Sequence, residues 1–203
     1  DLPMFPALVL IILDNNPLQF IEANIYHSLP KLEVLSLRHT KLTAMPNPGG
    51  IFPFMKLIDL QKNALLEFPI NFTHNFPNIT TLNLNDNMIN HWYSGMLTSF
   101  TELVKLDISN NPIRAFDIDS TVPANLIALA VGSALTDYID PPLLQSTAKM
   151  NRVELKGSRS MRIQDDFLCN SEMTKLIIDG LTFEGINSSC SMTIPLTFTL
   201  SDI

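Results

Sequence analysis

The chain has 203 residues, of which 46% are hydrophobic, so it is long and apolar enough to bury a sizeable core. Its 20 acidic and 13 basic residues give a net charge of -7, so no basic excess is present to neutralise nucleic-acid phosphates or anionic lipids. The most apolar run, residues 7–13, is far shorter than the roughly 20 residues of a bilayer-spanning helix. We therefore expect neither nucleic-acid binding nor membrane insertion of this segment.

Short strands are predicted at regular intervals along the chain. The stretch LVKLDISNNPI, residues 103–113, alternates apolar and polar residues and ends in asparagines and a proline, which predicts a half-buried strand followed by a turn. Clear copies begin at residues 8, 55 and 79, and degenerate copies begin at residues 32, 126, 150 and 173. Successive copies begin 23 or 24 residues apart. A register held over eight copies predicts a solenoid, because no single turn can bury its own apolar face.

A second apolar position follows each predicted strand at a fixed offset. It is occupied by Ile21, Met45, Phe68, Trp92, Phe116, Ile139, Ile163 and Ile186. Each turn is therefore expected to contribute a second inward-facing row to one continuous core.

These repeats resemble the extracellular type of the leucine-rich-repeat family, with the consensus LxxLxLxxNxLxxLxxxxFxxLxx. The resemblance covers Leu2 to about Leu200. It implies an α/β solenoid, a leucine-rich-repeat horseshoe of about eight repeats with a concave parallel β-sheet and irregular or short helical convex segments, as a single domain over residues 1–203. Because cysteine-rich flanking modules are missing from this sequence, we expect a fragment of a longer ectodomain, or ends covered by a partner, including a homodimer through those uncapped ends.

The same resemblance assigns the asparagine of the repeat to an internal ladder, whose amides satisfy backbone groups of adjacent turns. The asparagines at this position are Asn16, Asn63, Asn87 and Asn111. The position is occupied by Thr40, Ala134, Ser158 and Leu181 in the other repeats. We therefore expect the ladder to fail there and the last three repeats to be more irregular.

The two cysteines, Cys169 and Cys190, form no CxxC motif and have no histidine nearby to complete a zinc site. They lie on the far side of adjacent predicted turns, which favours a disulfide and an oxidising compartment. N-glycosylation sequons at Asn71, Asn78 and Asn187 agree with that compartment. Together these features predict an extracellular chain, secreted or at the cell surface.

Catalysis is not expected. The four histidines fall at different repeat positions and share no face with a nucleophile and a carboxylate, and no phosphate-binding glycine motif occurs. Asp59 and Asp107 share one outward position with Asn83 between them, which predicts a separation of about 10 Å on an open sheet. We interpret them as a solvated polar face, because nothing on an open sheet is expected to desolvate them or to separate their pKa values. The sequence therefore predicts no enzyme, no cofactor and no metal site.

In the family, the variable residues of each strand project from the concave face. The candidate partner-binding residues grade from apolar through acidic to basic along the chain: Leu10, Ile12, Val34, Leu57, Asp59, Asn83, Asn85, Asp107, Lys105 and Arg152. An apolar patch beside mixed charge suits a protein ligand, although the N-terminal apolar residues could instead contact a preceding repeat.

The resemblance implies a non-catalytic protein-recognition module, the ligand-binding part of a receptor such as a Toll-like or adhesion-type ectodomain. Two alternatives are an inhibitor that wraps a target enzyme and a structural spacer in a longer repeat array. An inhibitor would abolish turnover of its partner, whereas a spacer would bind no ligand.

Overall fold

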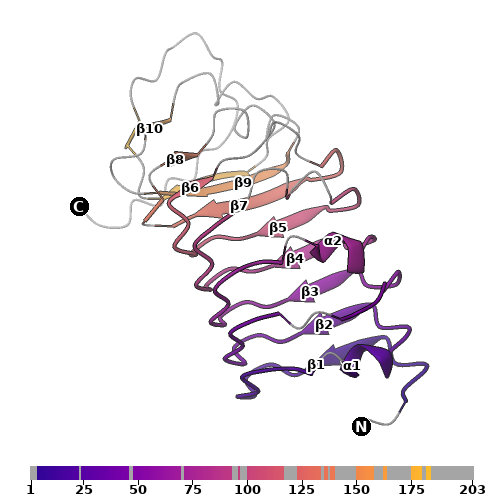
Figure 1. The fold of residues 1–203 in the computed structure, drawn as a ribbon. Helices are drawn as coiled ribbons and strands as arrows, with labels where there is room; N and C mark the ends of the chain where they lie inside the picture. Colours follow the sequence, from indigo (N-terminus) through magenta and orange to yellow (C-terminus); the bar gives the residue numbers. More distant parts are fainter. Residues whose placement is uncertain are drawn as a thin grey trace.

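The computed structural model describes residues 4–22, 24–45, 48–69, 71–92, 96, 100–116, 123–133, 135–136, 138–139, 150–157, 162–163, 175–179 and 182–183. An eight-stranded parallel sheet runs through them in the order β1-β2-β3-β4-β5-β7-β9-β11 (Figure 1). Its strands are β1 (Leu10–Ile12), β2 (Val34–Ser36), β3 (Leu57–Asp59), β4 (Thr81–Asn83), β5 (Lys105–Asp107), β7 (Ala128–Gly132), β9 (Arg152–Lys156) and β11 (Lys175–Asp179). The predicted solenoid with one strand per repeat is confirmed.

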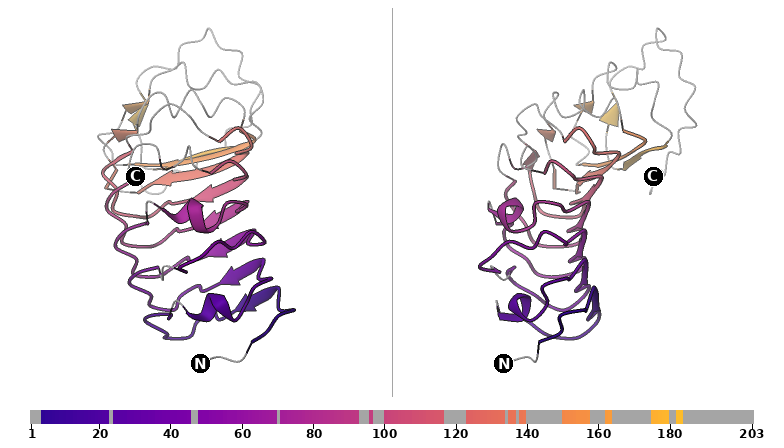
Figure 2. Two further views of the ribbon diagram at one scale, coloured as in Figure 1. Left: turned by 45° about the vertical axis from the view of Figure 1, so that its right-hand side comes forward. Right: turned by 90° about the vertical axis from the view of Figure 1, so that its right-hand side faces the viewer.

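The remaining elements are short. Helices α1 (Asn24–His27) and α2 (Phe72–Asn75) lie on the side of the solenoid opposite the sheet (Figure 2). Two two-residue strand pairs are also parallel: β6 (Ala115–Phe116) pairs with β8 (Tyr138–Ile139), and β10 (Arg162–Ile163) pairs with β12 (Thr182–Phe183). The segments between the sheet strands therefore contain short parallel strands as well as the irregular and helical segments that the sequence predicts.

The period-two alternation of each strand decides which side chains enter the core. The central residues Leu35, Ile58, Leu82 and Leu106 are buried and lie next to one another in the sheet register. The flanking residues of each strand point to the opposite face of the sheet. The second inward row is confirmed for Phe68 and Trp92, which are buried, and for Ile21 and Met45, which pack against the core.

Aromatic rings fill the space between the sheet and the helices. Tyr26, Phe52 and Phe76 form one group, with ring centroids 5.2 to 6.0 Å apart. Phe72 connects that group to Phe68 and Phe100, with centroids 4.7 Å and 6.1 Å away. These contacts link successive turns through edge and offset ring packing.

In each of the first five repeats, the residue directly before the ladder position adopts the left-handed backbone conformation. These residues are Asn15, His39, Lys62, Asp86 and Asn110, with φ between 53° and 62°. The conformation turns the chain out of the strand, and Asn and Asp tolerate it better than His or Lys.

The asparagine side chains that follow the strands bond to the backbone of two turns. Asn87 accepts from the backbone N–H of Leu65 at 3.1 Å and donates to the carbonyls of Leu60 and Leu84, both at 2.9 Å. Asn111 makes the corresponding bonds to Ile89, Leu84 and Ile108. Each interior amide thereby satisfies groups of its own turn and of the preceding one, which buried backbone requires.

Threonines take over part of this role where asparagine is missing. The Thr40 hydroxyl is buried and lies 2.9 Å from the Leu37 carbonyl, the acceptor that an asparagine amide would reach in its own turn. The Thr136 hydroxyl accepts from Ser133 N–H at 2.9 Å and donates to the carbonyl of Ile113 in the preceding turn at 2.7 Å. The ladder is thus modified rather than lost at Thr40.

Backbone N–H groups that have no asparagine partner in the next turn donate instead to a carbonyl of their own turn. Leu42, Leu65 and Ile89 donate to the asparagine of the next turn, whereas Leu18 and Ile113 donate to the carbonyls of Asn16 and Asn111, two residues earlier. These are three-residue turns of the γ type. Local turns therefore replace the inter-turn bond.

The strands of the last three repeats are longer than the others: β7, β9 and β11 each have five residues, whereas β1 to β5 have three. Most of these repeats outside the strands lies beyond the described residues, so their greater irregularity stays a prediction. Gly132 ends β7 with φ +91°, and it pairs with Lys156. A Cβ atom at Gly132 would lie 1.8 Å from the Lys156 carbonyl oxygen. Only glycine allows β7 and β9 to approach this closely.

We expect Asn87→Ala to destabilise the fold by about 1–3 kcal/mol, because it leaves buried backbone groups without partners. Asn16→Ala is the matched control, since Asn16 is exposed and, among the described residues, donates only to Leu13 and Asp14 of its own turn. Denaturant unfolding of both variants measures the difference. Equal losses for the two variants would contradict the inter-turn role of Asn87.

We expect Gly132→Ala to destabilise the fold by more than Gly49→Ala. Gly49 has φ +66° and open space around its Cβ position. Its substitution therefore measures only the cost of placing a residue with a Cβ in the left-handed conformation, about 1–2 kcal/mol. Gly132→Ala adds the steric conflict with Lys156. Thermal unfolding compares the two, and a Gly132→Ala variant as stable as Gly49→Ala would show that β7 and β9 separate without cost.

Candidate functional site: the outer sheet face

The strands present three aligned rows of side chains on the side of the sheet away from the core, which we call the outer sheet face. The first row is Leu10, Val34, Leu57, Thr81, Lys105, Ala128, Arg152 and Lys175. The second row is Ile12, Ser36, Asp59, Asn83, Asp107, Ala130, Glu154 and Ile177. The third row, directly after the short strands, includes Asp14, Arg38, Gln61, Asn85 and Ser109.

The N-terminal end of this face is apolar. Leu10 and Ile12 of the edge strand β1 are 47% and 61% exposed, and Val34 and Leu57 continue the first row as partly exposed neighbours. Four of the candidate binding residues therefore form one apolar patch. Exposed patches of this kind are uncommon without a contact partner.

Acidic and amide side chains form the centre of the face. Asp59 accepts from Gln61 N–H at 3.1 Å, lies 3.9 Å from the Arg38 guanidinium and contacts the Asn83 amide at 3.5 Å. The buried Asn85 Oδ1 has no hydrogen-bond partner among the described residues. The alignment of Asp59, Asn83 and Asp107 that the sequence predicts is confirmed.

Both aspartates are partly desolvated, contrary to the expectation of a solvated face. Burial raises the pKa of Asp59 and of Asp107 above the usual aspartate range. For Asp107 the hydrogen bonds from the Ser109 hydroxyl, at 2.7 Å, and from Ser109 N–H, at 3.0 Å, oppose this rise without cancelling it. The two values move in the same direction, so the pair is not divided into an acid and a base.

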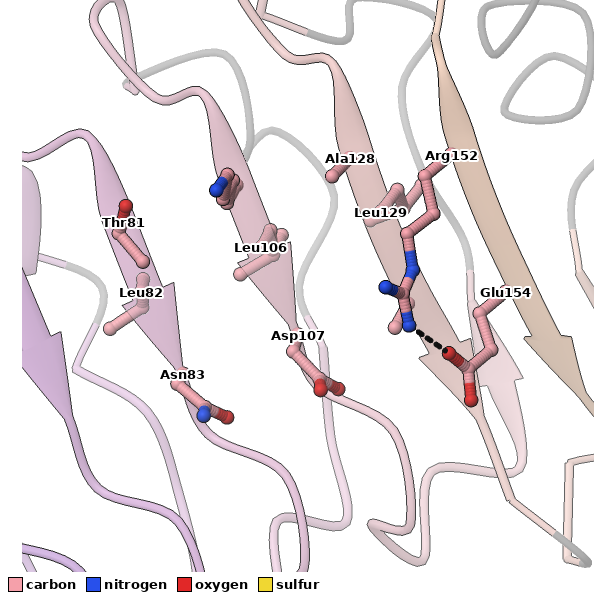
Figure 3. A pocket seen from close by; sticks show the side chains of 11 residues that line it. Thr81, Leu82, Asn83, Leu106, Asp107, Ala128, Leu129, Arg152 and Glu154 are labelled. Atoms are coloured by element: carbon pink, nitrogen blue, oxygen red, sulfur yellow. Dashed lines mark hydrogen bonds and ion pairs between the residues drawn. The ribbon is translucent and has the colours of Figure 1, made fainter. Parts of the chain in front are cut away.

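A hollow of about 320 Å³ opens on the outer sheet face between β5 and β9 (Figure 3). It is lined by Thr81, Leu82, Asn83, Lys105, Leu106, Asp107, Ala128, Leu129, Ala130, Arg152 and Glu154. Arg152 donates to Glu154 at 3.2 Å along its far wall, and Lys156 lies 3.8 Å from the same carboxylate. The site is therefore a recess with charged walls and a methyl-lined floor.

Glu154 is a residue of this site that the sequence-based candidates omit. It occupies the same repeat position as Asp59 and Asp107, so the repeat register alone contains the signal. The signal is weak in the repeat that begins at residue 150, because Ser158 stands at the ladder position in place of the asparagine that marks the register elsewhere.

Other predicted positions lie away from the face or outside the described residues. Asn71 is exposed directly before α2, and the Asn78 amide donates to the Pro53 carbonyl at 2.9 Å. Cys169, Cys190 and Asn187 lie outside the described residues, so the disulfide stays a prediction. Within the described ranges, no group of three or more His, Cys, Asp or Glu could hold a metal ion, and no helix is long and apolar enough to cross a membrane.

The stacked turns, parallel sheet and asparagine bonds define the fold as a leucine-rich-repeat solenoid. Residues 53–113 match the family model described as leucine rich repeat. A solved leucine-rich-repeat protein of Leptospira interrogans is similar over 82% of this chain, with a TM-score of 0.53 and 19% sequence identity. This chain spans 36% of the length of that protein. No curated protein matches the chain in sequence.

We expect Asp107→Asn to stabilise the protein at pH 7. Because the folded-state pKa is raised, the ionised carboxylate costs stability above that pKa, and the cost disappears as the pH falls below the unfolded-state value of about 3.9. Asparagine keeps the acceptor for Ser109 without the charge. Thermal unfolding should show a higher melting temperature than wild type at pH 7 and equal values below about pH 4.

Glu67→Gln, at an exposed acid outside the sheet, is the control for removing one negative charge from an acidic chain. If it stabilises the protein as much as Asp107→Asn does, general charge repulsion accounts for the result.

Proposed function

We propose that this chain is a non-catalytic protein-recognition module that binds a protein partner through the outer sheet face. Proteins with leucine-rich repeats generally mediate protein–protein interaction, and residues 53–113 match that family. The observation that carries the proposal is the alignment on one face of an exposed apolar patch, a desolvated acidic row and a basic row. Burial of apolar surface supplies affinity, whereas charge selects the partner and steers its approach.

The partly desolvated carboxylates support recognition, because their ionised forms lower the stability of the folded protein when no partner is bound. A raised pKa means that the ionised form of Asp107 is disfavoured in the folded protein. Ionisable groups with perturbed pKa values cluster at functional sites, and these two carboxylates also accept hydrogen bonds within the fold. In a complex, a cationic group of the partner would stabilise the ionised form.

The extracellular, receptor-type assignment is a finer proposal that rests on sequence features. The sequons at Asn71 and Asn78 lie outside the sheet strands, so glycans there would leave the outer sheet face open. A Toll-like or adhesion-type ectodomain is our proposal, with an enzyme inhibitor or a spacer as the alternatives. Abolished turnover of an enzyme partner would identify the inhibitor.

The exposed residues of β1 have a second interpretation. Leu10 and Ile12 lie at the edge of the sheet, where a further strand of a second copy or of another repeat could pair. A homodimer through this end therefore stays a prediction, which sedimentation over a range of concentrations tests.

We expect Leu57→Glu to weaken partner binding at least about tenfold, because it buries a charge where the face supplies apolar contact. The combined substitution Asp59→Asn and Asp107→Asn should mainly slow association and reduce its salt dependence. An array of purified secreted and cell-surface proteins from the source organism identifies the partner, and surface plasmon resonance then measures the rates.

Leu66→Glu is the matched control, because Leu66 is an exposed leucine outside the sheet strands. Binding lost in Leu66→Glu but kept in Leu57→Glu would place the interface elsewhere and refute the proposal. Circular dichroism establishes that both variants fold.

A further inference from the structure

We propose that the hollow above β7 receives an extended segment of the protein partner that inserts one acidic and one basic side chain, two residues apart. The acid lies over Ala128 and the base over Ala130. This inference rests on the proposed function and names the chemistry of the partner at one position of the face.

The hollow exists because two small residues interrupt rows of long side chains. Ala128 and Ala130 occupy the positions that Leu57 and Asp59 hold in β3. On either side of β7 the same positions carry charged side chains, in β5 and β9. The alanines therefore form a floor of methyl groups between charged walls.

The walls carry opposite charges in the two rows. Lys105 and Arg152 flank Ala128, whereas Asp107 and Glu154 flank Ala130. Adjacent strands are about 4.8 Å apart, so each alanine lies within reach of both flanking side chains. The cationic and anionic positions are two residues apart along a strand, a separation of about 6.6 Å.

The charges are only partly paired within the described part of the chain. Lys105 is exposed and makes no ion pair there, while Glu154 pairs with Arg152 across the two rows at 3.2 Å and with Lys156 at 3.8 Å. An occupant with a single charge would satisfy one row and oppose the other. An occupant with one carboxylate and one ammonium or guanidinium group satisfies both.

An extended peptide has the required spacing. Its alternate side chains point to one side about 6.6 Å apart, which equals the separation of the two rows. The α-ammonium and α-carboxylate groups of an amino acid do not fit this spacing, because they are joined through a single carbon and lie under about 3 Å apart. A segment parallel to β7 therefore reads acid-x-base, and an antiparallel segment reads base-x-acid.

The test uses synthetic nine-residue threonine peptides with central Glu-Thr-Lys, Lys-Thr-Glu or Gln-Thr-Gln, titrated at low salt into the isotope-labelled chain. We expect one charged peptide to shift the amide signals of Ala128 and Ala130 and to bind at least about tenfold more tightly than the neutral peptide. Added salt should weaken that binding. Equal binding of all three peptides, or no binding of either charged peptide, would overturn the inference.

Ala128→Leu is the decisive variant, because it fills the hollow without changing charge. Leucine is accommodated at this repeat position in β3, as Leu57. We expect the variant to fold and to lose the charged peptide, while Ala44→Leu, at an exposed alanine outside the sheet, binds as wild type does. Unchanged peptide binding by Ala128→Leu refutes the hollow as the site.

The two proposals fail in different ways. A protein partner that is weakened by Leu57→Glu but not by Ala128→Leu supports the proposed function and refutes the hollow inference. Peptide binding that Ala128→Leu abolishes, together with a partner that Leu57→Glu leaves unaffected, supports the hollow and refutes the apolar part of the interface.

Discussion

The hydrogen bonds of buried backbone groups are the constraint on which this solenoid depends. Every turn places carbonyl and N–H groups inside the molecule, where water cannot reach them. Interior asparagines such as Asn87 satisfy these groups in two turns at once, and so fix how one turn sits on the next. The alignment of the outward rows follows from that stacking, because side chains on successive strands share a row only while the register is constant.

The register survives where asparagine is missing, by other means. Thr136 bonds to the preceding turn through its hydroxyl, and the backbone of Ile113 closes a local turn. The strands β7 and β9 then pair over five residues, up to the close contact at Gly132. Arg152 consequently stays in line with Lys105, although the repeat that contains Arg152 matches the consensus less well than the repeat that contains Lys105.

The sequence predicts the strands, their parallel order and the alignment of Asp59, Asn83 and Asp107, because a fixed period and an alternating pattern determine all three. It does not predict the role of Thr136, since a hydroxyl replaces an amide only where the backbone brings it close enough. The raised pKa of Asp107 also escapes sequence reasoning, because it depends on how far the folded sheet buries the carboxylate and on how far the hydrogen bonds from Ser109 oppose that effect. The hollow arises only when Ala128 and Ala130 are placed between charged strands, whereas the position of Glu154 follows from the repeat register alone.

The two charged rows have a consequence for symmetry. Along the solenoid axis the turns are nearly equivalent by translation, so the backbone alone offers a ligand many similar positions. Along the strands β5 and β9 the face is asymmetric, because the first row holds cations and the second row holds anions. A ligand turned end for end would set like charge against like charge. A surface assembled from near-identical turns can in this way distinguish the two orientations of a bound ligand.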